Sequence, residues 1–191
     1  KDHVTLLEAM LRSVGIESTP ALINSERAYL LPATPVSGVF DHVITYIPSM
    51  NLFLDSTSRF TPMGVLPSEL KDKPVVLAST GMVMRTPADN VDVDKSEAKV
   101  KLILHEDGGI SGSSEVKHQG YFEVLSRQRT YESQNTPLHE VVTRALAKFN
   151  EAGTGKIRHP DPQELEVPWI IKSDFKLDSV VNLPGVAAMT L

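Results

Sequence analysis

Residues 39–57 read VFDHVITYIPSMNLFLDST, and this stretch decides the fold of the first half of the chain. Residues 39–47 are rich in β-branched and aromatic side chains, which favour a strand, and residues 52–54 form a second apolar run. The four residues PSMN between the two runs are typical of a turn. The sequence therefore predicts an antiparallel hairpin with its connection at residues 48–51.

His42 and Asp55 lie on the two arms of this predicted hairpin. A connection at residues 48–51 pairs residues whose numbers sum to about 99, and a shorter loop gives a sum of about 97 to 98. Either register places Asp55 opposite His42 or one diagonal step away, with Cβ atoms roughly 4.5–8 Å apart. An imidazole can reach a carboxylate over that distance. The pair could be the orienting half of a catalytic triad, or a common cross-strand polar pair on a solvated sheet face.

The residues ahead of the hairpin predict a helix and a strand. Residues 3–14 have the apolar spacing of an amphipathic helix, which Gly15 would end. The members of this stripe are His3, Leu6, Leu7, Met10, Leu11 and Val14. Residues 16–25 predict a short strand with Pro20 at its start or on a sheet edge. After the hairpin, residues 74–78 and 81–85 offer two more strands.

The pattern changes after the polar, acidic segment 87–95, where we place a domain boundary. Residues 96–104 alternate apolar and charged side chains, which predicts a half-buried strand. A tight turn at Gly108–Gly109 should return the chain antiparallel over residues 110–118. The remaining elements are expected to be helices at 121–132 and 138–149, the second ended by Gly153, and a β-like segment at 164–177. Residues 180–191 are expected to form a last apolar strand or an ordered extension.

These patterns predict an α+β protein of two domains. In residues 1–88 an N-terminal helix packs on an antiparallel sheet, and residues 96–191 form a smaller β-rich domain with one or two helices. The 191 residues carry a net charge of -5 without a dense cluster of Lys or Arg, which argues against a nucleic-acid partner. No apolar run approaches the roughly 18 residues that a membrane span needs. The chain has no Cys, and its six His are scattered, so we expect neither a metal site nor a cofactor.

Three short motifs resemble bacterial transglutaminase-like proteins of the papain-like cysteine protease superfamily. They are KDHVTLL at residues 1–7, FDHV at residues 40–43 and LDST at residues 54–57. In that family the nucleophilic Cys commonly lies directly before a Lys-Asp or similar pair at the start of a helix. The resemblance therefore implies a Cys immediately before Lys1, with His42 as general base and acid and Asp55 as its orienter in a catalytic triad.

The predicted helix agrees with this placement. A residue before Lys1 would share the buried edge of the stripe that contains His3 and Leu7. A Cys there, at the positive end of the helix dipole, would have a stabilised thiolate. The resemblance implies a hydrolase or acyltransferase that forms a thioester from an amide of a protein or peptide substrate. The chain itself has no Cys and is expected to be inactive as a truncated catalytic domain.

The resemblance covers roughly residues 1–80 and is looser beyond them. The turn at Gly108–Gly109 and the run from Gly120 to Arg127 are similar to the C-terminal β-rich domain of multidomain bacterial relatives. The family resemblance also implies a periplasmic or cell-envelope location, which the sequence does not otherwise indicate. Apolar surface exposed by truncation is expected to allow self-association.

Two other interpretations stay open. The chain could be a non-catalytic binding or structural module of the cell envelope that keeps a transglutaminase-like fold. It could instead be an unrelated β-rich domain with an accidental His/Asp pair, in which case the helix at 3–14 would not pack against the hairpin.

Other polar and aromatic residues receive structural roles. Ser56, Thr57 and Ser58 are expected to hold the turn and the Asp55 carboxylate rather than act as nucleophiles. Asp41 is expected to be solvated on the opposite strand face, and Trp169 to pack in a core or between domains.

Overall fold

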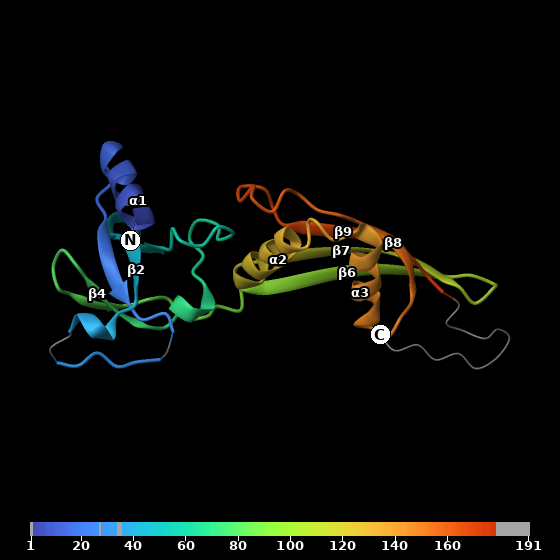
Figure 1. Ribbon diagram of the computed structural model, residues 1–191, viewed down its shortest axis with the longest axis horizontal. Coiled ribbons are helices and arrows are strands. Elements are labelled where there is room, and N and C mark those ends of the chain that lie inside the picture. Colours follow the sequence, from blue (N-terminus) through green and yellow to red (C-terminus); the bar gives the residue numbers. More distant parts are fainter. Residues whose placement is uncertain (1, 27, 34–35, 179–191) are drawn as a thin grey trace. The chain divides into compact units, whose positions relative to one another are not determined.

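The computed structural model describes residues 2–26, 28–33 and 36–178, which form an α+β protein with three α-helices and two antiparallel sheets (Figure 1). This confirms the fold class expected from the sequence. The chain divides into two compact units. The first is Lys1–Lys95 with Gly120–Val124, and the second is Ser96–Gln119 with Leu125–Leu191. The sequence placed the change of domain in the segment 87–95 and did not predict that residues 120–124 group with the first unit.

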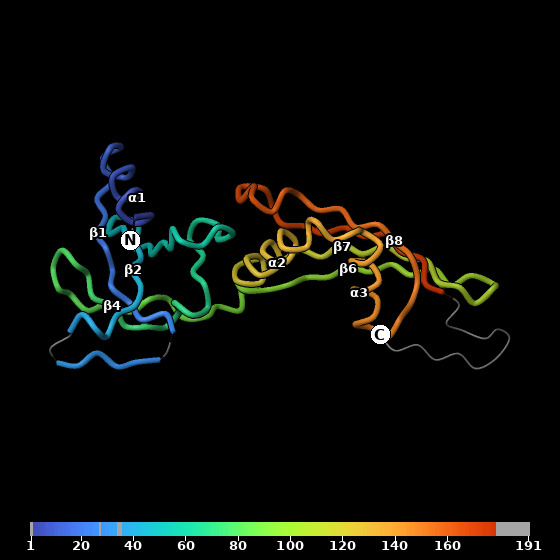
Figure 2. The backbone as a smooth tube through the Cα atoms, viewed as in Figure 1, coloured from blue at the N-terminus to red at the C-terminus, as the bar shows by residue number. Residues whose placement is uncertain are grey.

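The first unit is built on a five-stranded sheet whose order is β3-β2-β1-β4-β5. Its strands are β1 (Thr19–Ile23), β2 (His42–Ile47), β3 (Leu52–Leu54), β4 (Pro74–Leu77) and β5 (Val83–Arg85). Figure 2 follows the backbone through these strands in turn. β1 lies at the centre, so Pro20 is not on a sheet edge. It is the second residue of its strand, and the pairing with β4 begins only at Ala21, where the missing N–H of proline is no longer an obstacle.

β2 and β3 form the predicted hairpin. The paired residues are Thr45 with Leu54, Tyr46 with Phe53 and Ile47 with Leu52, so their numbers sum to 99 in each case. A 3-10 turn at Pro48–Met50 makes the connection, and Asn51 closes it with a left-handed backbone at φ 47°. The strand begins at His42 rather than at residue 39, because Ser37–Val39 is a 3-10 turn instead.

The main hydrophobic cluster of the first unit lies on one face of this sheet, and on β2 the other face is buried as well, at Thr45 and Ile47. Alternate residues of the strands and two residues of the following loops pack together in this cluster, and the rings of Tyr46 and Phe53 lie with centroids 4.6 Å apart. The buried members are Ala21, Ile23, Ile44, Tyr46, Phe53, Leu66, Leu70, Val75 and Leu77. Burial of alternate side chains fixes the strand register, because a slip of one residue would turn this set to the other face.

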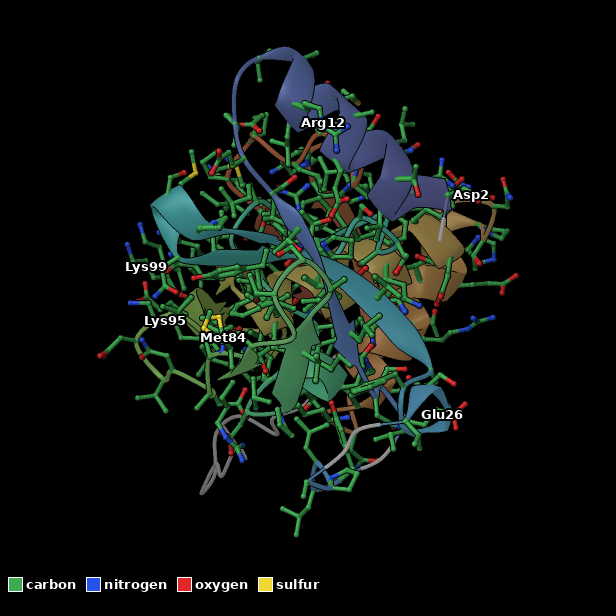
Figure 3. All side chains as sticks on the ribbon, turned by 90° about the vertical axis from the view of Figure 1, so that its left-hand side faces the viewer. Asp2, Arg12, Glu26, Met84, Lys95 and Lys99 are labelled. Carbon is green, nitrogen blue, oxygen red and sulfur yellow. The ribbon has the colours of Figure 1, made fainter. Side chains whose placement is uncertain are left out.

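The helix α1 (Asp2–Ser13) packs against β2. In Figure 3 the labels Asp2 and Arg12 mark its two ends. Gly15 follows it at φ 77°, a conformation that favours glycine after a helix. The contact contradicts what an accidental His/Asp pair in an unrelated domain would predict. Little of the predicted apolar stripe is covered, since Leu6, Met10 and Val14 are exposed and only Leu7 and Leu11 are half-buried. The buried residue of the helix is Val4, which lies outside that stripe.

The second unit contains a four-stranded sheet in the order β6-β7-β9-β8. Its strands are β6 (Lys95–Leu104), β7 (Ile110–Gln119), β8 (Gly153–Arg158) and β9 (Ile170–Leu177). β8 was not predicted, and Gly153 begins this strand instead of ending a helix. Residues 164–169 lie outside any strand, so the β-like segment is shorter than expected. The strand or extension predicted at 180–191 lies outside the described residues.

The edge strand β6 differs from the sequence prediction. Its apolar side chains were expected to be half-buried, but Val100, Leu102 and Leu104 are all exposed on this strand at the end of the sheet order. Alternation of apolar and charged residues sets which face a side chain takes, but it does not decide whether another layer covers that face.

Two helices complete the described chain, α2 (Tyr121–Glu132) and α3 (Leu138–Ala147). α3 packs against β8. Arg127 of α2 is fully buried, lies 4.7 Å from the Trp169 ring and donates hydrogen bonds to the carbonyls of Glu164 and Val167. Trp169 is therefore a packing residue. None of the helices in the described part of the chain has the length and apolar character needed to cross a bilayer.

Candidate functional site

The predicted pair of His42 and Asp55 is in contact. His42 is the first residue of β2, and Asp55 directly follows β3, one diagonal step away in the observed register. The distance from His42 Nε2 to Asp55 Oδ1 is 3.3 Å, and the two side chains are 23% and 5% exposed. A carboxylate only accepts hydrogen bonds, so Nε2 carries the proton of this bond. Nδ1 is then the ring nitrogen left to exchange a proton with a reacting group.

The carboxylate of Asp55 is held by Thr57. The backbone N–H of Thr57 donates to Asp55 Oδ1 at 2.9 Å, and its hydroxyl Oγ1 donates to the same oxygen at 2.7 Å. This is a local turn in which an Asp side chain bonds the backbone two residues on. The role expected for Thr57 is confirmed, whereas Ser56 Oγ is buried without a hydrogen-bond partner and Ser58 Oγ pairs with Thr61.

These contacts move both pKa values away from their ordinary ranges. The hydrogen bond to Asp55 raises the pKa of His42 above 6.5, and burial of the ring opposes this shift without cancelling it. Burial alone would raise the pKa of Asp55, but hydrogen bonds from His42 and Thr57 outweigh it and hold the pKa below 3.8. Both shifts favour the charged forms, the imidazolium of His42 and the carboxylate of Asp55.

The start of α1 meets the segment that carries Asp55. His3 Nδ1 lies 3.0 Å from the backbone carbonyl oxygen of Ser56. Beside this contact is a mostly apolar hollow of about 340 Å³. It is lined by Asp2, His3, Leu6, Leu7, Met10 and Ser56. The first turn of the helix and the residue after Asp55 therefore share one wall of a surface hollow.

Asp41 is exposed, as expected, and it also has a structural role. Its carboxylate accepts hydrogen bonds from the hydroxyl of Ser25, at 3.0 Å, and from the backbone N–H groups of Ser25, at 2.7 Å, and Glu26, at 3.3 Å. Burial would raise the pKa of Asp41, but these hydrogen bonds outweigh it and hold the pKa below its ordinary value. The negative charge also contributes to the raised pKa of the neighbouring His42. Asp41 thus anchors the loop after β1 and does not join the His42 hydrogen bond.

The remaining histidines do not assemble a second site. His105 Nε2 lies 2.8 Å from Ser111 Oγ, and His118 Nδ1 lies 2.8 Å from Ser96 Oγ, so the two rings engage separate serines of the second sheet. Within the described ranges no group of three His, Asp or Glu side chains is placed to hold a metal ion.

The sequence singled out the dyad but missed the contact between His3 and Ser56. His3 was interpreted as a partly buried member of the apolar stripe, yet its side chain is exposed and bonds a backbone carbonyl. Every residue type has a backbone carbonyl, so the sequence does not show which carbonyl accepts a hydrogen bond. The one available signal was the placement of a polar ring in the first turn of a helix that should approach the hairpin.

Comparisons of the chain with protein-family models, with curated proteins and with solved structures found no match.

Proposed function

We propose that residues 1–88 carry the His/Asp part of the active site of a transglutaminase-like cysteine enzyme, an amide hydrolase or acyltransferase. The observation that carries the proposal is the hydrogen bond between His42 Nε2 and Asp55 Oδ1, held by Thr57 and lying next to the segment that contacts the start of α1. The family resemblance of the three motifs supports the choice of a thiol as the nucleophile.

In this proposal the nucleophilic Cys occupies the position directly before Lys1. α1 begins at Asp2, so a thiol two residues earlier would lie at the positive end of the helix dipole, which lowers a thiol pKa. The raised pKa of His42 suits a thiolate–imidazolium pair, in which the histidine is protonated before the reaction starts. The chain contains no Cys, and we expect the 191 residues alone to be inactive.

The reaction follows from these roles. The thiolate sulfur forms a bond to the carbonyl carbon of a protein or peptide amide, and the C–N bond breaks as His42 Nδ1–H gives its proton to the leaving nitrogen. The product is a thioester. Water or a primary amine then attacks the thioester, His42 takes up the proton of that attacking group, and the thiolate leaves. Asp55 keeps Nε2–H oriented in both steps and stabilises the imidazolium.

A chain extended by Gly-Ser-Cys ahead of Lys1 tests this function. Dimethylcasein would serve as acyl donor and a biotin-labelled primary amine as acceptor, with ammonia release measured in the absence of the amine to detect hydrolysis. We expect turnover from the Cys extension and none from a matched Gly-Ser-Ala extension. His42→Ala in the Cys-extended chain should reduce the rate by about 100-fold or more, since it removes the proton-transfer group.

The competing interpretation is a non-catalytic binding or structural module. It predicts that the Cys extension, the Ala extension and the His42→Ala variant give the same background with water and with the amine, while the His42–Asp55 hydrogen bond persists in the chains that keep His42. That result would exclude the proposed enzyme activity and would leave His42 and Asp55 as a structural contact.

A further inference from the structure

We propose that His3 is a positioning residue, which fixes the peptide group that holds the Asp55 carboxylate against His42. The inference rests on the proposed function for its catalytic meaning. The positioning role itself depends only on a series of hydrogen bonds within the first unit, so it can be tested on the protein without any nucleophile.

The argument begins with the direction of the hydrogen bond. His3 Nδ1 lies 3.0 Å from the carbonyl oxygen of Ser56, and a carbonyl oxygen can only accept. Nδ1 must therefore carry a proton, and the neutral form of His3 is the Nδ1–H tautomer. Two elements that are 53 residues apart in sequence are joined by this one donor.

The carbonyl that His3 binds belongs to a peptide group with a second role. The carbonyl of Ser56 and the N–H of Thr57 lie in the same planar peptide unit, so neither can turn without the other. That N–H donates to Asp55 Oδ1 at 2.9 Å, and the same Oδ1 accepts from His42 Nε2 at 3.3 Å. His3 thus holds one side of a rigid group whose other side holds the carboxylate.

The arrangement makes the hydrogen bonds mutually supporting. A donor at the carbonyl oxygen polarises the peptide group and makes its N–H a better donor to Asp55. Loss of the His3 contact frees the Ser56–Thr57 peptide group to rotate, and the carboxylate then loses a fixed orientation toward His42. His3 itself touches a backbone carbonyl rather than the dyad, so its role is positioning.

The test is an NMR titration of the His42 imidazole in the 191-residue chain, compared with the His3→Leu and His3→Asn variants. We expect His3→Leu to lower the pKa of His42, because a less well held Asp55 stabilises the imidazolium less. The sign is diagnostic. Simple removal of a nearby positive charge would raise the pKa of His42. The charged groups that act on His42 are Asp55, Asp41 and the N-terminal amine, and the variant keeps all three.

His3→Asn separates the hydrogen bond from other effects of the substitution. The side-chain amide of Asn can donate to the Ser56 carbonyl as Nδ1–H does, so we expect it to restore most of the wild-type pKa. His139→Leu is the matched control, since it removes an exposed helical histidine from the other unit and should change nothing. An unchanged or raised pKa in His3→Leu, or equal effects of Leu and Asn, would overturn the proposal.

In the Cys-extended chain the same variants separate positioning from substrate binding. His3→Leu should reduce kcat by about 10- to 100-fold, the range expected when a catalytic group is misplaced by about 1 Å, with little change in KM. If His3→Leu lowers the pKa of His42 but the Cys-extended protein shows no turnover, the positioning role of His3 is supported and the proposed enzyme activity is rejected. Turnover without any effect of His3 would support the enzyme and reject the role of His3.

Discussion

The imidazole of His42 has two nitrogens with different surroundings. Nε2–H is engaged by Asp55, and this bond raises the pKa of the ring. A carboxylate on one ring nitrogen orients the imidazole and stabilises the imidazolium, which serves a thiol and a hydroxyl nucleophile alike. The choice of a thiol therefore rests on the resemblance of the three motifs and not on the electrostatics of the dyad.

Asp55→Asn tests the main cause of the raised pKa. Asn keeps the size of the side chain and an oxygen acceptor but removes the negative charge, so we expect the pKa of His42 to fall. NMR titration of the imidazole measures it. Asp41→Asn is the matched control, because Asp41 acts on His42 through its charge alone and is a smaller cause of the shift. A larger decrease in Asp41→Asn than in Asp55→Asn would contradict the assignment.

Thr57→Val tests the hydroxyl that holds the carboxylate. Val has nearly the shape of Thr and leaves the backbone N–H in place, but it removes the Oγ1 donor to Asp55. We expect the pKa of Asp55 to rise, because its charged form loses a hydrogen bond, and stability to fall by less than about 1 kcal/mol at this exposed position. Carboxyl NMR titration and urea denaturation measure the two effects. Ser58→Ala, which removes a neighbouring hydroxyl that does not touch Asp55, should leave that pKa unchanged.

Among the secondary-structure elements, the hairpin could be predicted most fully. Its two apolar arms and the turn PSMN set the register, and the observed sum of 99 is the one that this turn predicts. The proximity of His42 and Asp55 followed from that register. The loops were harder to predict, because two of the three hydrogen bonds to Asp41 come from backbone N–H groups, which every residue type except proline offers, and the third comes from the hydroxyl of Ser25.

Other elements were missed because the deciding interactions are distant in sequence. β8 reads GTGKIR, and its glycines hide the alternation that identifies a strand. A Cβ atom at Gly155 would lie 2.7 Å from the Asp174 carbonyl, so the neighbouring strand requires glycine there. β6 alternates clearly but is uncovered, since coverage depends on which elements pack over the sheet edge rather than on the strand itself.

Asn51 tests the turn that sets the hairpin register. Its backbone is left-handed at φ 47°, and its Oδ1 accepts a hydrogen bond from the Tyr46 hydroxyl at 3.0 Å. Asn51→Ala removes both the tolerance for this conformation and the acceptor, and should lower the free energy of unfolding by about 1–2 kcal/mol. Asn51→Gly loses only the acceptor and should lower it less. Urea denaturation followed by circular dichroism compares them, and equal losses would contradict the role of the backbone conformation.

At the scale of the whole molecule, the α+β class and the two antiparallel sheets were predictable from composition and periodicity. The grouping of residues 120–124 with the first unit was not, because the chain leaves that unit at the strand β6 and returns after β7. Such a return has no local signature in the sequence. The candidate site was predictable because both its residues belong to one hairpin, and the contribution of α1 to it was not.

The pH dependence of folding stability provides a test at this scale. The pKa of His42 is raised in the fold, so its contribution is fully present below pH 6.5 and is lost as pH rises through the folded value. The pKa of Asp55 is lowered, so its contribution is present above pH 3.8 and is lost as pH falls through the folded value. Wild type should therefore exceed Asp55→Asn most in unfolding free energy at about pH 5, and less at about pH 9. Urea denaturation at the two values measures the difference, and a larger gap at the alkaline value would contradict this sign.

The most direct test of the proposed site is the rate of thiol alkylation by iodoacetamide as a function of pH in the chain extended by Gly-Ser-Cys. Ser79→Cys, which places a thiol on an exposed turn, supplies the reference for an ordinary cysteine. We expect the added thiol to react well below the ordinary thiol pKa of about 8.5, and to lose this reactivity in His42→Ala. An added thiol that titrates like the Ser79→Cys reference, with or without His42, would show that the dyad does not act on a nucleophile at that position.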